Sequence, residues 1–229
     1  DTVSSEQSTR LRQLVAMRSA HVPLQYLLGE WGFYNVVLQV GEGVLIPRQD
    51  TEIVVETALG LIQNKCAPRV VDLCAGSGAI GVALRHERRD AAVLCVELSD
   101  KAMPYLVRNA KTEGVQVQCA DVFGFEATLV DDALDLIVAN PPYVSAAEYA
   151  SLAPELYKEP KMALVAAQDG LLFYDYIARN YKTKLAPGGA LCFEIGASQR
   201  HAVCEFLSQN GFIGIDSVQD LGGNDRCVW

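Results

Sequence analysis

The sequence predicts an α/β fold in which a seven-stranded, mostly parallel sheet carries helices on both faces. Two observations lead to this prediction. From residue 50 almost to the end of the sequence, apolar runs of strand length alternate with segments of helical length, and this alternation is typical of parallel strands joined by helices. A glycine-rich stretch, 76–81, also follows one apolar run directly and opens a helical segment. We therefore expect a ligand site at the carboxyl ends of the strands.

Two segments are expected before the sheet begins. Residues 6–18 have the spacing of a helix, with apolar side chains at Leu11, Leu14, Val15 and Met17 in an otherwise polar segment. Pro23 interrupts the chain after this helix. Residues 30–34 and 36–40 are rich in aromatic and β-branched side chains and predict a small β-hairpin.

The sheet and its helices are expected from residue 51 onward, in alternating order. Strands are predicted for residues 69–74, 92–97, 115–119, 134–139 and 189–195, followed by two closing strands. Helices are predicted for residues 51–62, 79–88, 100–113, 170–185 and 198–210. The pattern Ser145-Ala-Ala-Glu148 is a capping box that opens one further short helix.

Composition narrows the functional classes. No apolar run approaches the roughly 20 residues that cross a bilayer, and the polar first ten residues are not a secretory signal. Seven cysteines without a CxxC pair predict buried, reduced thiols in strands and a cytoplasmic protein, and three scattered histidines predict no metal site. The net charge of −9 argues against binding duplex nucleic acid through its phosphates. We expect neither a membrane nor a nucleic-acid partner.

A cofactor site is predicted around the glycine-rich loop. Gly76-Ser-Gly-Ala-Ile-Gly81 matches GxGxxG between a strand and a helix, where glycines let the backbone approach a ligand and the helix offers unpaired N–H groups. Glu97 ends the next strand, where a carboxylate can accept hydrogen bonds from both ribose hydroxyls. These features predict an adenosine-type cofactor but do not separate NAD(P) from S-adenosylmethionine.

Asp72 favours S-adenosylmethionine. A carboxylate four residues before Gly76 would repel a pyrophosphate, whereas it suits a ligand with an ammonium group and a sulfonium centre. The alternative role for Asp72 is an acceptor that caps the helix or ties the loop. Asp121 follows the third strand, where a side chain can meet the adenine edge, and Val122 and Phe123 can pack on the adenine face.

The tetrapeptide Asn140-Pro141-Pro142-Tyr143 is the predicted catalytic centre. Two prolines remove two N–H donors, so the Pro141 carbonyl and the Asn140 side-chain oxygen can together accept both protons of a planar NH2 group. This geometry aims the nitrogen at an electrophilic methyl group and favours the positive charge that develops on it. Tyr143 offers a flat face for the group that carries the nitrogen. The alternative is a rigid turn that closes a strand.

These motifs resemble those of class I S-adenosylmethionine-dependent methyltransferases that act on planar nitrogen, which include adenine-N6, guanine-N2 and glutamine-N5 enzymes. Flanking motifs are similar to those of the release-factor glutamine N5-methyltransferases (PrmC/HemK). They are Pro23-Leu-Gln-Tyr-Leu-Leu-Gly-Glu-Trp31, Leu45-Ile-Pro-Arg-Gln-Asp-Thr-Glu52, Glu159-Pro-Lys-Met-Ala-Leu-Val-Ala-Ala167 with Asp169-Gly170, and Asp220-Leu-Gly-Gly-Asn-Asp-Arg226. Together they cover residues 22–229.

The resemblance implies a Rossmann-like class I methyltransferase that modifies the glutamine of the Gly-Gly-Gln loop in peptide-chain release factors and yields S-adenosylhomocysteine. It implies cofactor contacts from Glu97, Val122, Asn140 and the loop residues Cys74, Ala75, Gly76, Ser77 and Gly78. The amide pocket would comprise Asn140, Pro141, Pro142 and Tyr143. Arg48 and Thr51 would border the site, with Glu52 orienting it; the alternative role for Arg48 is a surface charge.

The resemblance also divides the chain. Residues 1–22 would be a truncated remnant of an N-terminal helical substrate-binding domain, residues 23–45 a β-hairpin linker, and residues 46–229 the methyltransferase domain. Gln49 stands where the family has a second proline. Two alternatives stay open at this point: an adenine-N6 or guanine-N2 methyltransferase on nucleic acid, and an NAD(P) dehydrogenase or silent binding module.

Overall fold

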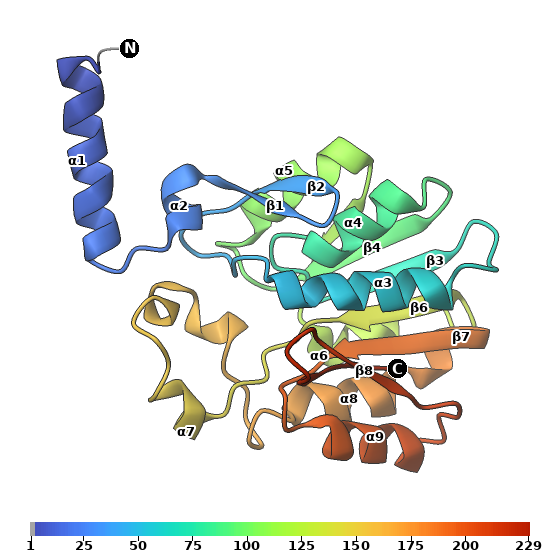
Figure 1. Cartoon of the computed structure of the whole chain (residues 1–229). Coiled ribbons are helices and arrows are strands. Elements are labelled where there is room, and N and C mark those ends of the chain that lie inside the picture. The colour runs from blue at the N-terminus through green and yellow to red at the C-terminus, as the bar shows by residue number, and fades with distance from the viewer. Residues whose placement is uncertain (1–2) are drawn as a thin grey trace.

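The central feature of the computed structural model, which describes residues 3–229, is a seven-stranded sheet with the strand order β5-β4-β3-β6-β7-β9-β8 (Figure 1). Residues 1–2 of the predicted N-terminal segment lie outside the described part. The sheet strands are β3 (Arg69–Leu73), β4 (Ala92–Glu97), β5 (Gln116–Cys119), β6 (Leu134–Ala139), β7 (Leu185–Glu194), β8 (Ser217–Gln219) and β9 (Asp225–Val228). Strands β3 to β7 pair in parallel, and β9 lies antiparallel between β7 and β8. The predicted fold class is confirmed.

Strand order places the candidate site. The order reverses at β3, because β4 and β5 follow on one side of it and β6 and β7 on the other. In open parallel sheets, ligands bind outside the carboxyl ends of the strands at such a reversal. The loops that follow β3, β4 and β6 therefore come together at one edge of the sheet.

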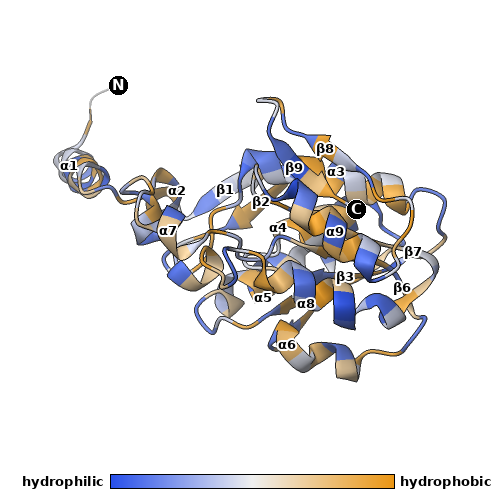
Figure 2. Ribbon diagram, turned by 90° about the horizontal axis from the view of Figure 1, so that it is seen from below, coloured by the Kyte–Doolittle hydropathy of each residue, from blue (hydrophilic) through white to orange (hydrophobic). Residues whose placement is uncertain are grey.

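Helices cover both faces. Buried side chains of α3 (Glu52–Leu61), α4 (Ala79–Glu87) and α5 (Met103–Glu113) pack on one face, and those of α6 (Val122–Phe125), α8 (Leu172–Asn180) and α9 (Arg200–Gln209) pack on the other. Val70 and Val71 of β3 belong to opposite clusters, as the alternation of side chains along a strand requires. Figure 2 shows hydrophobic residues concentrated in the sheet and on the sides of the helices that face it.

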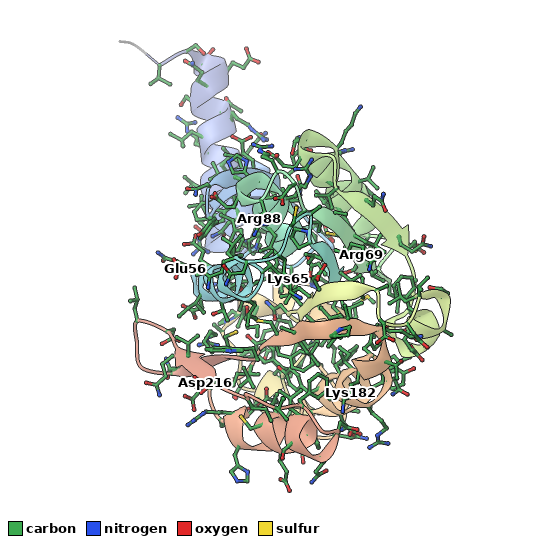
Figure 3. All side chains as sticks on the ribbon, turned by 90° about the vertical axis from the view of Figure 1, so that its right-hand side faces the viewer. Glu56, Lys65, Arg69, Arg88, Lys182 and Asp216 are labelled. Atoms are coloured by element: carbon green, nitrogen blue, oxygen red, sulfur yellow. The ribbon has the colours of Figure 1, made fainter. Side chains whose placement is uncertain are left out.

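Glycines make the packing around α4 possible. Gly78 precedes the helix with φ +84°, and a Cβ atom at Gly81 would lie 2.3 Å from Cys95 Sγ in β4. Only a glycine lets α4 approach the sheet this closely. At the opposite, amino-terminal end of the strands, Arg88 donates hydrogen bonds of 2.7 Å to the backbone carbonyls of Ile62 and Lys65. Figure 3 views the molecule from this end and labels Lys65, Arg69 and Arg88 there.

The N-terminal helix stands apart from the sheet. Helix α1 (Ser5–Ser19) begins at the capping box of Ser4 and Gln7, and none of its described residues is buried. Figures 1 and 2 both show it projecting away from the rest of the molecule. The predicted hairpin is present as β1 (Glu30–Phe33) and β2 (Val36–Gln39), and the capping box at Ser145 does open a short helix, α7 (Ala146–Tyr149).

The structure adds one helix that was not predicted and moves two of the predicted boundaries. A short helix, α2 (Leu24–Leu28), follows Pro23 where only a break was expected; Pro23 occupies the N-cap and Gly29, at φ +81°, ends the helix. Helix α8 stops at Asn180 rather than near 185. Strand β7 begins at Leu185 instead of 189, because a shift in register between Leu134 and Leu136 of β6 accommodates the Pro-Gly-Gly of β7.

The cysteines only partly follow the prediction. Cys95, Cys192 and Cys227 lie buried in strands, but Cys66 and Cys119 are exposed. Cys119 is in the edge strand β5, which explains its exposure. Among residues 3–229 no helix is long and apolar enough to cross a membrane, and within the same range no three His, Cys, Asp or Glu side chains gather as a metal site would require.

Candidate active site

A cavity opens where the strand order reverses. Its walls come from the segment before α3, the ends of β3, β4 and β6, the loop before α8, and α8 itself. Most residues predicted to form the site line it: Arg48, Thr51, Asp72, Cys74, Ala75, Gly76, Ser77, Glu97, Asp121, Val122, Phe123, Asn140 and Pro142. Of the described residues predicted there, Gly78, Pro141 and Tyr143 do not line the cavity.

Glu97 holds the glycine loop in place. One carboxylate oxygen accepts a hydrogen bond of 2.8 Å from the backbone N–H of Gly76, and the other accepts one of 2.7 Å from Ser99. The loop itself needs left-handed backbone at Cys74, Gly76 and Gly78. Each carboxylate oxygen keeps a second lone pair. Glu97 therefore shapes the loop and still offers acceptors at the end of β4.

Asp72 ties the helix to the strand, which is one of the two roles considered for it. Its Oδ2 accepts a hydrogen bond of 2.9 Å from the backbone N–H of Gly81, which ties α4 to β3. Its Oδ1 is buried and, within residues 3–229, has no hydrogen-bond partner. Burial raises the pKa of this carboxyl from 3.8 to about 7. A buried acceptor without a partner is costly, so a carboxylate in this wall fits a cationic ligand.

An apolar wall faces the glycine loop. Asp121 caps α6 through a 3.0 Å hydrogen bond from the Phe123 N–H, and Val122 is buried beneath it. The Phe123 ring packs against Phe173, with ring centroids 5.1 Å apart, and against Tyr176 at 4.7 Å. Phe173 lines the cavity but gave no signal in the sequence, because its position on α8 reads as an ordinary core position. These rings can cover a flat aromatic ligand.

The Asn-Pro-Pro-Tyr loop follows β6 and is fixed from behind. The backbone N–H of Tyr143 donates to the Leu164 carbonyl at 3.2 Å, and Gln199 Nε2 donates to the Tyr143 carbonyl at 2.9 Å. A Cβ atom at Gly170 would lie only 2.0 Å from that same carbonyl oxygen. The Tyr143 hydroxyl donates to Glu194 at 3.3 Å. The loop is thus a rigid turn, and its Asn140 and Pro142 also form part of the cavity wall.

Glu194 is a buried carboxylate that sequence reasoning missed. It ends β7 with 1% of its surface exposed. Its Oε2 accepts a 2.6 Å hydrogen bond from the Thr51 hydroxyl, and Asn140 Nδ2 donates to the same hydroxyl at 3.4 Å. Burial raises the pKa of Glu194 to about 7, although Thr51 and Arg226 favour the ionised form. The available signal was an acidic residue inside the apolar strand 189–195.

An ion pair joins two segments at the edge of the cavity. Arg48 pairs with Glu159, whose other oxygen accepts a 3.0 Å hydrogen bond from the Ile46 N–H. Two motifs far apart in the sequence are joined in this way, and Arg48 lines the cavity rather than standing as an isolated surface charge. Glu52 does not orient the site directly. It accepts a 2.9 Å hydrogen bond from the Tyr34 N–H and so anchors the hairpin.

Known proteins resemble this chain in sequence and in fold. Residues 51–191 match the family model of the methyltransferase small domain. The chain is 38% identical to a release factor glutamine methyltransferase of Fusobacterium nucleatum, over 99% of this chain and 65% of that protein. It is 41% identical to one of Bordetella pertussis, over 99% and 84%. Among solved structures, a methyltransferase from Pyrococcus furiosus shares the fold, with a TM-score of 0.61 and 14% identity over 98% and 96% of the two chains.

Proposed function

The chain belongs to the release factor glutamine methyltransferases, and we propose that it methylates the N5 amide of the glutamine in the Gly-Gly-Gln loop of peptide-chain release factors. The methyl donor would be S-adenosyl-L-methionine. One observation carries the proposal: Asp72, whose buried Oδ1 has no hydrogen-bond partner among residues 3–229, and Asn140 line the same cavity. One residue fits a cationic donor and the other fits an amide acceptor.

The chain's own residues provide a place for the donor. Asp72 would attract its ammonium group, Glu97 would accept from the ribose hydroxyls, and the loop 74–78 would bring backbone N–H groups close. Asp121 would meet the adenine edge, and Val122 and Phe123 its face. When bound, S-adenosylmethionine supplies an electrophilic methyl group on a sulfonium centre.

The amide pocket would orient the glutamine nitrogen. Asn140 Oδ1 and the Pro141 carbonyl would each accept one proton of the NH2 group, which fixes the nitrogen and stabilises the positive charge that develops on it. Pro142 and Tyr143 would complete the pocket, with Arg48 and Thr51 at its border. No strong base is required: as the N–CH3 bond would form and the methyl–sulfur bond break, the nitrogen would become four-coordinate and positively charged, and an N–H proton on such a nitrogen is acidic enough to pass to water.

An amino-methyltransferase acting on adenine N6 or guanine N2 is the second candidate, because the same tetrapeptide suits a planar base nitrogen. The charge of the chain disfavours it. A net charge of −9 opposes the phosphate contacts from which nucleic-acid enzymes gain affinity.

Methyl transfer to full-length release factor, followed by peptide mass mapping, tests the proposal. We expect the methyl group on the glutamine of Gly-Gly-Gln and none on a release factor in which this motif is Gly-Gly-Ala. Equal methylation of both proteins, or methylation of DNA or RNA alone, would contradict it. Calorimetry with S-adenosylhomocysteine and with NAD is the control for the cofactor, and binding of NAD alone would exclude a methyltransferase.

A further inference from the structure

We propose that Glu194 and Thr51 form a positioning chain that sets the orientation of the Asn140 side-chain amide, so that its oxygen faces the substrate nitrogen. Neither residue needs to touch the reacting atoms; both act through Asn140. The inference deepens the proposed function and rests on it for the identity of the substrate amide. It does not depend on which protein carries that amide.

The orientation matters because the two ends of an asparagine amide have the same shape and opposite hydrogen-bonding roles. Its oxygen accepts hydrogen bonds and its NH2 group donates them. Only the oxygen can bind a substrate NH2 group. If the amide were turned over, two NH2 groups would face each other, and no acceptor would meet the positive charge that develops on the attacked nitrogen. The side-chain volume alone does not select between these two states.

The hydrogen bonds to Thr51 and Glu194 select one of the two orientations of the Asn140 amide. A carboxylate only accepts, and the Glu194 carboxylate takes the single hydroxyl proton of Thr51 over 2.6 Å. The Thr51 oxygen is left with acceptor capacity alone, and Asn140 Nδ2 lies 3.4 Å from it. The amide nitrogen is therefore held toward Thr51. In the described residues Asn140 Oδ1 has no hydrogen bond to the protein, and it is the end left for the cavity.

The positioning chain is shielded from water, so water does not compete for its hydrogen bonds and their donor-to-acceptor direction is fixed. Thr51 is 3% exposed and Glu194 is 1% exposed. The two residues are 143 positions apart in the sequence, one before α3 and the other at the end of β7. Tyr143 donates to the second oxygen of the same carboxylate at 3.3 Å. Each carboxylate oxygen of Glu194 thus accepts a hydrogen bond from one of the two segments that flank the amide pocket.

Protonation of Glu194 would reverse the direction of the hydrogen bonds in the positioning chain. A neutral carboxyl can donate to Thr51, whose proton would then turn toward Asn140 and favour the inverted amide. The groups that act on Glu194 are Arg226 and the Thr51 and Tyr143 hydroxyls, which favour ionisation, and Asp50, which opposes it. The Tyr174 hydroxyl donates to the Glu194 backbone carbonyl at 2.9 Å. With a pKa raised to about 7, the carboxyl changes state close to neutral pH.

The first test compares variants of Thr51. Thr51→Val keeps the shape and removes the hydroxyl, so we expect kcat with release factor to fall about 30-fold, as for a lost positioning group, with the release-factor KM changed less than about threefold. Thr51→Ser keeps the hydroxyl and should stay within about threefold of the unchanged enzyme. Thr57→Val is the matched control, because Thr57 is bonded only to the Ile53 carbonyl within its own helix. S-adenosylhomocysteine calorimetry verifies folding, and an unchanged kcat in Thr51→Val overturns the proposal.

A double-mutant cycle separates positioning from general support. If Thr51 acts through Asn140, Thr51→Val in the Asn140→Ala background should lower kcat by less than about twofold, because no amide remains to be oriented. An equal loss in both backgrounds would mean that Thr51 acts independently, and would refute the chain. Glu194→Gln should likewise lower kcat in the unchanged protein, and by less than about twofold in the Asn140→Ala background.

The pH profile is the readout that a merely structural role would not move. At saturating S-adenosylmethionine, we expect kcat to fall about tenfold from pH 8 to pH 6, in proportion to the ionised fraction of a group with a pKa of about 7. Glu194→Gln should be less active at pH 8 and lose this pH dependence. Glu113→Gln is the control and should keep it, because Glu113 lies on α5 and pairs with His86 and Arg89. An unaltered profile in Glu194→Gln contradicts the inference.

A measurement without turnover keeps the inference apart from the proposed function. The Asn140 side-chain NH2 signals in ¹⁵N NMR should show one proton hydrogen-bonded in the unchanged protein and in Thr51→Ser, and neither in Thr51→Val. Identical signals in all three proteins would overturn the positioning chain. If the unchanged protein shows these signals but does not methylate release factor, the proposed function fails and the orientation of Asn140 stands.

Discussion

Two buried carboxylates are central to the site at the scale of single residues, and they have different tasks. Asp72 keeps one oxygen without a partner in the described structure, whereas both oxygens of Glu194 accept hydrogen bonds from side chains. Burial raises the pKa of each carboxyl to about 7. A buried carboxylate oxygen without a hydrogen-bond partner suits a ligand, whereas a fully hydrogen-bonded carboxylate fixes the side chains around it. Substitutions should distinguish the two.

Asn140→Ala tests the amide pocket. Removing the acceptor should lower methyl transfer at least about 100-fold, because the substrate nitrogen loses its positioning contact. Binding of S-adenosylhomocysteine by calorimetry should stay within about threefold, since Asp72 and Glu97 remain. Turnover equal to that of the unchanged protein would exclude Asn140 from the reaction.

Asp72→Asn tests the cation site through pH. The Asp72 carboxyl is ionised above its raised pKa of about 7, so the affinity for S-adenosylhomocysteine, which keeps the ammonium group, should rise about tenfold from pH 6 to pH 8. The variant should bind more weakly at pH 8 and show no such rise. Calorimetry at both pH values measures this, and a pH dependence retained in Asp72→Asn would point to another group.

The same substitution should stabilise the ligand-free protein. A carboxyl whose pKa is higher in the folded state favours folding fully below its unfolded value near 4, and this contribution is lost as pH rises to about 7. At pH 8 the buried charge of Asp72 therefore destabilises the fold. Asp72→Asn should raise Tm at pH 8 by about 3–8 °C and leave it nearly unchanged at pH 4, as measured by differential scanning calorimetry.

The sequence alone was enough to select candidate residues where a local pattern implies a chemical role. The glycine loop, Asp72, Glu97 and Asn140 sit in local patterns that imply their chemical roles, and the structure brings all of these segments to one cavity. Glu194 and Phe173, and the contact that Thr51 makes with Glu194, were different. Their importance depends on contacts across many residues of sequence, such as the 143 between Thr51 and Glu194, and no local pattern encodes such a contact.

At the scale of elements, the loop that bears Asn140 depends on a glycine from another segment. Gly170 has φ +85°, and its backbone closely approaches the Tyr143 carbonyl. Gly170→Ala would place a methyl group 2.0 Å from that oxygen. We expect Tm to fall by about 5 °C or more and methyl transfer to drop at least about tenfold, because the tetrapeptide must move.

Gly60→Ala is the matched control for that experiment. Gly60 lies in α3 with nothing within 4 Å of its added Cβ, so the substitution should stabilise the protein by about 0.5–1 kcal/mol and leave turnover unchanged. Thermal melting and initial rates measure both. If Gly170→Ala behaved like Gly60→Ala, the contact with Tyr143 would not support the loop.

Element boundaries were harder to predict than element types. Helix α2 spans five residues, too few to show a helical period after Pro23. The Pro-Gly-Gly of β7 indicated a loop, but the shift in register against β6 lets the strand include it. The start of β7 is therefore set by its pairing with β6, whereas α2 is bounded locally by Pro23 and Gly29.

At the scale of the whole molecule, α1 contributes little to the fold. No described residue of α1 is buried, and its ion pair from Arg18 to Glu155 joins two side chains that are each more than 40% exposed. Such a pair contributes only about 0–1 kcal/mol. Leu11, Val15 and Met17 remain exposed on this helix. We propose that residues 1–22 contact the release factor rather than stabilise the methyltransferase domain, 46–229, to which residues 23–45 connect them.

Removing residues 1–19 tests this division. Tm should change by less than about 2 °C and the affinity for S-adenosylhomocysteine by less than about twofold, because none of the residues described in α1 is buried. The KM for release factor should rise several-fold, while kcat should change little. A large drop in Tm would instead assign α1 to the fold, and an unchanged KM would remove its role in substrate binding.

The position of β9 also has a consequence for biosynthesis. Val228 and Cys227 pair with Phe193 and Glu194 of β7, and β9 in turn carries β8. During translation, every other strand of the sheet is made before β9, so a nascent chain that ends before residue 225 leaves one edge of β7 open and Glu194 without its cover. We therefore expect the proposed positioning chain to Asn140 to reach its final form only after ribosomal synthesis has passed this strand. Until then we expect the strands beside the proposed cofactor site to fold while the orientation of Asn140 is not yet fixed.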